Sequence, residues 1–311
     1  MTRPLIAVLG PTASGKSGLA EWLAQQRNGE LVNADASALY RELEVGVTKP
    51  DRATRDRLPY HLLDIVELHQ TVTVVDYQRQ ALATLEEIAS RGKLPILVGG
   101  SSLYVRALLE GYLPPDVEVP EAVRARVREL PRELAAQELG ALDPAFLARI
   151  DVLNPRRVSR ALELVLASGG PVPPATSRPL PGWSILRLIL RPERAILERR
   201  VRERTEQMWP AWLEECLLLE KKGLAHWLEI RKPIGYSAVM RYLQGGLARA
   251  EAVEEIVRAT ILLAKKQRTW LQKDTEGLDR HQWVLSESSD WEQLPEQALG
   301  AVDGFLARFT K

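Results

Sequence analysis

The sequence is poor in the residues that build disulfide frameworks, thiolate metal sites and membrane spans. It has a single cysteine, Cys216, which excludes a disulfide within the chain and a zinc site made of several cysteines. No stretch reaches the roughly 18 apolar residues that a membrane span needs, so we expect no membrane partner. The first ten residues, MTRPLIAVLG, run almost directly into an apolar segment. They leave no room for a signal peptide, and we therefore expect a cytoplasmic protein.

The chain also lacks an excess of charge of either sign. Its 42 basic and 41 acidic side chains give a net charge of +1, so any surface for nucleic acid must be a local patch. Residues 113–200 contain 14 arginines, no lysine and 11 acidic residues, a net charge of +3. This mild excess makes the middle of the chain the better candidate for such a patch.

Short apolar runs alternate with helical patterns over the first hundred residues. Residues 5–9, 31–35 and 94–98 have the length and composition of buried strands. Residues 17–26 have helical apolar spacing, and Thr73, followed by Asp76, has the pattern of a helix N-cap. Strands that alternate with helices predict an α/β fold with a parallel sheet flanked by helices.

The middle of the chain departs from this alternation. Residues 113–183 are helical and arginine-rich, and prolines border them on both sides. We predict a mainly helical insert over 113–183, carried by a core made of 1–112 and 184–311. After the insert we expect a strand over 185–190, helices to Lys273, a short strand around Val284 and a last helix to about Arg308.

A phosphate-binding motif follows the first predicted strand. The motif is G-x4-G-K-[ST], and it leads from the strand into a helix, which is the setting of a P-loop. Its backbone N–H groups and the helix N-terminus would hold phosphate oxygens. Lys16 would neutralise them, and Ser17 would ligate Mg²⁺. The predicted diphosphate site comprises Gly10, Pro11, Thr12, Ala13, Ser14, Gly15, Lys16 and Ser17.

Polar residues at strand ends are the catalytic candidates. Asp35 ends the second predicted strand, at the sheet edge where parallel sheets bind ligands, and can act as a base or can simply shape a turn. Ser101 follows Gly99 and Gly100, and can cap the next helix or contact a diphosphate. The glycines would let a ligand approach the backbone closely. Asp64 is the nearest candidate for the metal-binding acid of an NTPase.

Two basic groups lie on predicted helices. Arg200 and Arg204 are four residues apart and share a helix face, so they can clamp a diphosphate or form a solvated surface. Lys265, Lys266 and Arg268 leave the same two possibilities open.

Taken in order, these motifs resemble the tRNA dimethylallyltransferase family, also called tRNA isopentenyltransferases. The resemblance spans about residues 4–285. It rests on the P-loop and on segments that follow at family-like spacing, which are Asp35 with Ala38–Arg41, Val45-Gly46 with Lys49-Pro50, His61–Asp64, Val98–Gly100 with Leu103-Tyr104, Arg157 with Arg160–Glu163, Leu190–Pro192, Arg200 with Arg204 and Met208, Ile234–Tyr236, and Ala264–Gln267 with Thr269-Trp270.

The resemblance implies a reaction and its partners. It implies transfer of a dimethylallyl group from dimethylallyl diphosphate to N6 of adenosine 37 in tRNA, with Mg²⁺, by a nucleotide-binding protein that is expected to be a monomer. Catalytic roles are implied for Asp35, Ser101 and Arg204, and a diphosphate contact for Arg200. The insert would bind the anticodon stem-loop. The implied tRNA contacts are Asp35, Ala38, Arg157, Arg160, Lys265, Lys266 and Gln267.

Some positions differ from the family pattern, and other functions stay open. Ala36 stands where the family commonly has Ser, Asn154 replaces Asp, Val47 and Ser101 replace Thr, and Ile261-Leu262 replaces an Arg-Gln pair. Shikimate-type P-loop kinases share the P-loop but lack the long insert. Adenylate isopentenyltransferases have a smaller insert. A non-catalytic RNA-binding protein with this fold is the third alternative.

Overall fold

The computed structural model describes residues 2–112, 115, 117–178, 180–273, 282–286 and 293–309, with only the backbone for 273 and 282–286. The chain divides into two compact units, one of residues 1–109 and 180–311 and one of residues 110–179. We call them the catalytic unit and the insert. The sequence had placed the insert at 113–183; in the structure residue 183 already begins a strand of the sheet.

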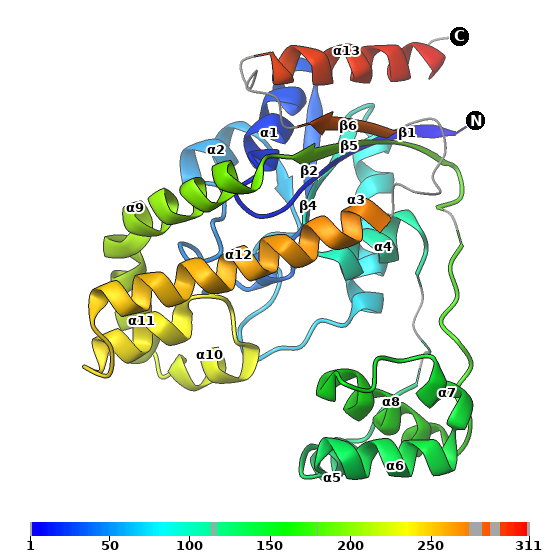
Figure 1. The fold of residues 1–311 in the computed structure, drawn as a ribbon. Helices are drawn as coiled ribbons and strands as arrows, with labels where there is room; N and C mark the ends of the chain where they lie inside the picture. The colour runs from blue at the N-terminus through cyan, green and yellow to red at the C-terminus, as the bar shows by residue number, and fades with distance from the viewer. Residues whose placement is uncertain are drawn as a thin grey trace. The chain divides into compact units, whose positions relative to one another are not determined.

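A six-stranded sheet forms the centre of the catalytic unit, with the strand order β3-β2-β4-β1-β5-β6 (Figure 1). Every neighbouring pair is parallel, so the carboxyl ends of the strands lie along one edge. The predicted α/β class is therefore confirmed. The strands are β1 (Arg3–Leu9), β2 (Gly29–Ala34), β3 (Tyr60–His61), β4 (Leu94–Gly99), β5 (Trp183–Arg191) and β6 (Gln282–Ser286).

Helices cover both faces of this sheet because side chains alternate between the faces of each strand. Along β1, Ile6 and Val8 pack into one cluster with α1 (Lys16–Gln26) and α13 (Leu294–Leu306). Leu5 and Ala7 pack into the other with α3 (Val74–Ser90) and α4 (Ser102–Leu109). The predicted N-cap of α3 is confirmed, since Thr73 and Asp76 form a reciprocal capping box.

A lobe of helices extends the catalytic unit beyond the sheet. Its members are α9 (Arg194–Lys221), α10 (Ala225–Arg231), α11 (Tyr236–Leu243) and α12 (Arg249–Lys273). The long helices α9 and α12 run side by side, and they share a hydrophobic cluster that includes Val201, Trp212 and Ile256 (Figure 1). The basic candidates from the sequence lie in this lobe, with Arg200 and Arg204 on α9 and with Lys265, Lys266 and Arg268 on α12.

Short elements connect the sheet to its helices. They are the 3₁₀ turn η1 (Ser37–Leu39) and α2 (Arg52–Arg57). A further 3₁₀ turn, η2 (Ala307–Phe309), follows the last helix, α13. The two-residue edge strand β3 has no counterpart among the predicted strands, because two residues carry no periodicity. None of the helices in the described part of the chain combines the length and hydrophobicity needed to cross a membrane.

The insert has a hydrophobic core of its own. It consists of α5 (Glu121–Arg128), α6 (Arg132–Leu142), α7 (Pro144–Ala148) and α8 (Pro155–Ser168). Val127, Leu139 and Leu162 are buried at its centre. Asn154 caps α8 by accepting hydrogen bonds from the N–H groups of Arg156 and Arg157, so the departure from Asp at this position keeps the cap.

Candidate active site

The P-loop has the backbone geometry of an anion cradle. Ala13 and Gly15 have positive φ angles of 61° and 87°, and α1 begins directly after them at Lys16. Positive φ angles at alternate residues turn successive backbone N–H groups toward one point. The first N–H groups of the following helix add to them, because they have no hydrogen-bond partner within the helix. Within the loop, Ser14 is fully buried, and its hydroxyl has no hydrogen-bond partner among the described residues.

Two long helices contact the P-loop at Thr12. Thr12 donates its N–H to Oε1 of Gln267 on α12 at 2.8 Å. Its hydroxyl accepts a hydrogen bond from Nη2 of Arg204 on α9 at 3.0 Å. The helical lobe therefore fixes the P-loop from two sides, and it brings an arginine to the phosphate site.

A cavity of about 730 Å³ opens at the carboxyl edge of the sheet, entirely within the catalytic unit. It brings together most of the catalytic and diphosphate-binding candidates, although Thr12 and Arg204 among them are 192 positions apart in the sequence. The lining includes Thr12, Ala13, Gly15, Lys16, Ser17, Asp35, Ala38, Arg200 and Arg204.

The cations of this cavity are held in a poorly solvated place. Burial lowers the pKa of Lys16 to about 8; the negative charge of Asp35 opposes this shift and Arg204 adds to it. Burial also lowers the pKa of Arg204, again opposed by Asp35. The pKa of Arg200 is lowered by burial and by the neighbouring Arg199. Clustered cations of this kind favour a ligand with more than one negative charge.

The turn after β2 fixes Asp35. Asn33 accepts a hydrogen bond from the N–H of Asp35 at 2.9 Å, and donates to the carbonyl groups of Asp35 and Leu62 at 3.0 Å. Oδ1 of Asp35 accepts from the N–H of Ser37 at 3.1 Å. Its carboxylate is thus oriented by one backbone bond and lines the cavity.

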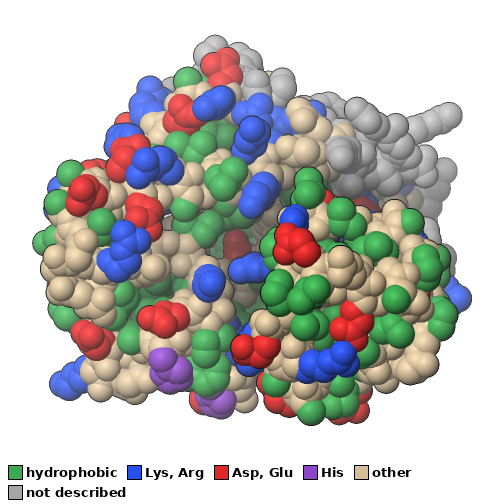
Figure 2. Space-filling model, turned by 60° about the horizontal axis from the view of Figure 1, so that its bottom comes forward, with side chains coloured by type: hydrophobic (Ala, Val, Ile, Leu, Met, Phe, Trp, Pro, Cys, Tyr) green, Lys and Arg blue, Asp and Glu red, His purple; other side chains and the backbone are tan. Residues whose placement is uncertain are grey.

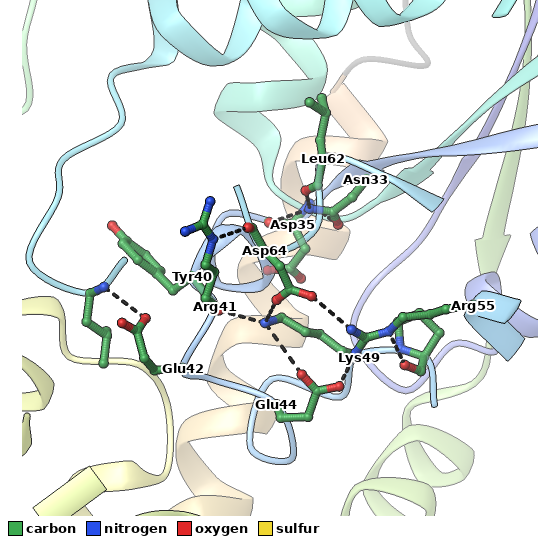
Figure 3. A network of polar contacts seen from close by, with 12 residues as sticks. Asn33, Asp35, Tyr40, Arg41, Glu42, Glu44, Lys49, Arg55, Leu62 and Asp64 are labelled. Carbon is green, nitrogen blue, oxygen red and sulfur yellow. Dashed lines mark hydrogen bonds and ion pairs between the residues drawn. The ribbon is translucent and has the colours of Figure 1, made fainter. Parts of the chain in front are cut away.

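An ion-pair network supports the wall beside Asp35 (Figure 3). The ammonium group of Lys49, whose side chain is 0% exposed, contacts Oδ1 of Asp64 at 2.5 Å and the carbonyl oxygen of Tyr40 at 2.6 Å. Arg55 contacts the other oxygen of Asp64 at 2.8 Å, and also pairs with Glu44. Asp64, which the sequence suggested as a metal-binding acid, thus has both carboxylate oxygens engaged by cations.

A second support for this wall comes from α9. Glu215 accepts hydrogen bonds from three successive N–H groups, those of Glu44, Val45 and Gly46, at 2.5, 3.1 and 3.2 Å. Tyr236 donates its hydroxyl to the same carboxylate at 2.9 Å. The helix that presents Arg204 to the P-loop therefore also holds the turn that leads to Lys49.

Ser101, Gln267 and the two glycines make contacts that the sequence did not indicate. Oγ of Ser101 accepts the N–H of Ala36 at 3.1 Å, so this hydroxyl braces the Asp35 turn, and Ser101 is not among the described residues that line the cavity. Gln267, which the resemblance assigned to tRNA, is buried, with both polar atoms bonded to backbone. A Cβ on Gly99 would lie 2.3 Å from the carbonyl oxygen of Ala34; both glycines at this turn make room for protein atoms rather than only for ligand.

Ala38, another implied tRNA contact, is buried at 4% exposure, whereas the four basic RNA candidates are exposed. Lys265 and Lys266 lie on α12, and Lys265 lines a second hollow between α9 and α12. Arg157 and Arg160 are exposed on α8 of the insert, where Arg160 pairs with Glu163 at 3.0 Å. On the face drawn in Figure 2, Lys and Arg side chains are interspersed with Asp and Glu.

Sequence reasoning missed Asn33, Glu215 and the role of Lys49. Asn33 is a polar residue inside an apolar strand, and this is a signal that could have been read. Glu215 sits among the charged residues of a long helix, and nothing in the sequence pairs it with residues 44–46, which lie about 170 positions earlier.

The fold and the cavity define a P-loop α/β protein whose phosphate cradle faces a carboxylate across one pocket. Comparison with known proteins gives the family. A family model described as IPP transferase matches residues 38–274. The chain is 40% identical over 304 residues to a tRNA dimethylallyltransferase of Salinispora arenicola, which covers 96% of this chain and 86% of that protein. It is 34% identical over 310 residues to that of Pelotomaculum thermopropionicum, with 97% and 98% covered. The chain belongs to the IPP transferase family.

Solved structures agree with this assignment. The full-length tRNA isopentenylpyrophosphate transferase of Bacillus halodurans superposes with a TM-score of 0.69 at 28% identity, covering 98% of this chain and 97% of that one. A eukaryotic dimethylallyltransferase acting on tRNA superposes with a TM-score of 0.80 at 22% identity, covering 99% and 80%, which is a likeness of fold. The resemblance found in the sequence is therefore confirmed.

Proposed function

We propose that the chain transfers a dimethylallyl group from dimethylallyl diphosphate to N6 of adenosine 37 in tRNA, releasing diphosphate. One observation carries this proposal: Lys16 of the P-loop and Arg204 of α9 share a cavity with Asp35, whose carboxylate is oriented by a backbone hydrogen bond. An anionic leaving group and a proton acceptor are what a prenyl transfer to an amine requires. The names of the curated relatives supply the acceptor, a tRNA.

The carboxylate of Asp35 would accept the proton that the acceptor amine loses. The exocyclic amine of adenine is a poor nucleophile because its lone pair is delocalised. As the bond from N6 to C1 of the dimethylallyl group forms, the proton moves from N6 to Asp35, and the C1–O bond electrons pass to the diphosphate. The target base must leave its stack to reach this cavity.

The P-loop and α9 would stabilise the departing diphosphate. Lys16 and Arg204 are already in place, so their charges oppose the charge that develops on the leaving oxygen without further rearrangement. Arg200 lines the same cavity one helical turn earlier. The P-loop here binds a product, and no phosphoryl group is transferred.

The donor atoms at the P-loop fit Mg²⁺. Within the described residues, no group of three or more His, Cys, Asp or Glu side chains is placed to hold a metal. The hydroxyl of Ser17 lines the cavity at the start of α1. Mg²⁺ is commonly held by one or two protein oxygens, water and substrate phosphates, so we propose that Ser17 supplies the protein ligand. When bound, the ion would add positive charge at the diphosphate.

The RNA contacts are proposed for exposed cations in both units. Four exposed side chains can reach RNA phosphates: Lys265 and Lys266 on α12, and Arg157 and Arg160 on α8. We propose that the insert binds the anticodon stem-loop. A cytoplasmic monomer is the proposed working form, and light scattering during gel filtration tests the oligomeric state.

Nucleoside mass spectrometry tests the function directly. The protein is incubated with Mg²⁺, dimethylallyl diphosphate and unmodified tRNA whose position 37 is adenosine, and the digested RNA is analysed. We expect N6-isopentenyladenosine, and none when adenosine 37 is replaced by guanosine. Prenylation of free AMP at the rate of tRNA would indicate an adenylate isopentenyltransferase. Consumption of ATP with a small alcohol, without any prenyl product, would indicate a kinase.

A further inference from the structure

Gln267 on α12 makes two buried hydrogen bonds to different backbone segments of the catalytic unit. The residue is only 6% exposed. Oε1 accepts the N–H of Thr12 at 2.8 Å, and Nε2 donates to the carbonyl oxygen of Gly100 at 3.0 Å. A Cβ on Gly100 would lie 2.5 Å from Nε2, so the missing side chain of this glycine makes room for the amide.

Each of these hydrogen bonds reaches a segment that contacts one part of the proposed site, either the diphosphate loop or the turn that carries the base. On the leaving-group side, Thr12 also accepts a hydrogen bond from Arg204, whose charge faces the phosphate cradle. On the base side, Gly100 is followed by Ser101, whose hydroxyl holds the N–H of Ala36, the residue after Asp35. One carboxamide therefore connects the diphosphate loop to the turn that carries the proton acceptor.

A carboxamide is suited to this position because the two backbone groups have opposite polarity. The N–H of Thr12 needs an acceptor, and the carbonyl of Gly100 needs a donor. Leucine supplies neither group, and an ionised glutamate supplies only the acceptor. A buried backbone group without its partner is costly, so the two segments would shift to find new partners. The distance between the P-loop and Asp35 would then no longer be fixed.

We propose that Gln267 is a positioning residue that fixes the diphosphate loop relative to the base, and that it makes no contact with RNA. This inference rests on the proposed prenyl transfer. The neighbouring residues of Lys265-Lys266-Gln267 would then have two different roles. The lysines are exposed and remain candidates for RNA, whereas Gln267 points into the protein and holds the catalytic centre together.

The test compares neighbouring variants of the full chain. Gln267→Leu removes both bonds at similar size, Gln267→Glu keeps the acceptor, and Lys266→Ala serves as the contrasting change on the exposed side. Three quantities are measured for each: the Kd of inorganic diphosphate with Mg²⁺ by calorimetry, the Kd of an anticodon stem-loop, and the single-turnover prenylation rate.

We expect Gln267→Leu to weaken diphosphate binding about tenfold and to lower the single-turnover rate by about 10²-fold, as a displacement of about 1 Å would. Its stem-loop Kd should stay within twofold of wild type. Lys266→Ala should show the reverse, with weaker stem-loop binding and unchanged diphosphate binding. If Gln267→Leu does not fold, Gln267→Glu is judged by the same criteria.

Two results would overturn the inference. One is a diphosphate Kd within twofold of wild type, and the other is a loss of stem-loop affinity in the Gln267 variant. Failure of the proposed function is distinguishable, because it appears as absent prenylation by the wild-type protein. In that case diphosphate and stem-loop affinities still decide the role of Gln267.

Discussion

The P-loop site of the catalytic unit and the insert hold their cations in different surroundings. Lys16 and Arg204 are partly buried at the P-loop, and this burial lowers the pKa of both. In the insert, arginines lie on exposed helix faces, where Arg126 pairs with Glu138 and Arg160 with Glu163. A buried cation gains most from a bound anion because water solvates it poorly. Exposed pairs contribute little to stability, and salt screens them.

This difference separates two kinds of anion recognition. The partly buried cations at the P-loop are positioned for one small, highly charged group, and through Lys16 its binding should depend on pH. The exposed arginines are suited to a long phosphate backbone, and ionic strength should govern theirs. Variants of each unit can show whether the two units divide the substrate in this way.

Removing the insert should abolish tRNA modification and leave donor binding intact. Each unit has its own hydrophobic core, so residues 112–179 can be replaced by a glycine-serine linker and the catalytic unit should fold. We expect the prenylation rate of tRNA to fall by about 10³-fold or more because the acceptor is no longer held. Calorimetry with dimethylallyl diphosphate should give a Kd near that of the full chain.

Ionic strength provides the matched control for that deletion. In the full chain, tRNA affinity should fall steeply between low and physiological salt, since phosphate contacts release counterions. Donor affinity should fall less. A folded linker variant that prenylates an anticodon stem-loop as fast as the full chain would contradict the assigned role of the insert.

Within the catalytic unit, Asp35→Asn should slow the chemical step by about 10²-fold or more. The amide oxygen of asparagine can still accept the N–H of Ser37, so the turn should keep its shape. The affinities for donor and tRNA should therefore change little. Single-turnover rates measured by rapid quench test this expectation, and a rate within a few-fold of wild type would make Asp35 a structural residue.

The sequence predicted the sheet and the phosphate cradle because both are encoded locally. Residues 5–9 are a continuous apolar run, and the P-loop is one short motif with a fixed spacing. The same holds for the capping box at Thr73. Local patterns of this kind need no knowledge of the tertiary structure.

The hydrogen bonds that support the site could not be predicted from the sequence because they join distant segments. Gln267 and Thr12 are 255 positions apart, and Glu215 and Val45 are 170 apart. On a helical wheel both acceptors look like ordinary polar residues of a solvated face. Their burial depends on how α9 and α12 pack against the sheet edge, and periodicity does not encode that packing. For Gln267, the family resemblance named a tRNA contact, whereas the structure places the side chain inside the protein.

Arg204→Ala should produce a smaller loss than Asp35→Asn, of about tenfold to 10²-fold in kcat, with a higher KM for the donor. The guanidinium group both faces the cradle and holds the hydroxyl of Thr12, so binding and catalysis should suffer together. Arg204→Lys should restore the charge without the planar fork, and therefore only part of the activity. Steady-state kinetics with varied donor concentration test this. Full activity of Arg204→Ala would contradict a diphosphate contact and would make Arg204 part of a solvated surface.

The smallest effect we expect is a pH dependence of donor binding that comes from Lys16. Its pKa of about 8 in the free protein lies below the ordinary 10.5, so the side chain loses its proton as the pH rises through 8. A bound diphosphate favours the charged form and raises that pKa again. Binding at pH 8 should therefore take up about half a proton, and affinity should fall about tenfold between pH 7 and pH 9.

Calorimetry in buffers with different ionisation enthalpies measures this proton uptake. Lys16→Met should bind dimethylallyl diphosphate more weakly, with an affinity that is flat over the same range. Asp35 supplies part of the charge that keeps Lys16 protonated, so Asp35→Asn should move the midpoint of the wild-type profile below pH 8. The proposed contacts of the insert with the stem-loop are arginines, so their contribution to stem-loop affinity should stay constant over this range because arginine does not titrate there. An equal pH dependence for donor and stem-loop would contradict the division of anion recognition between the two units.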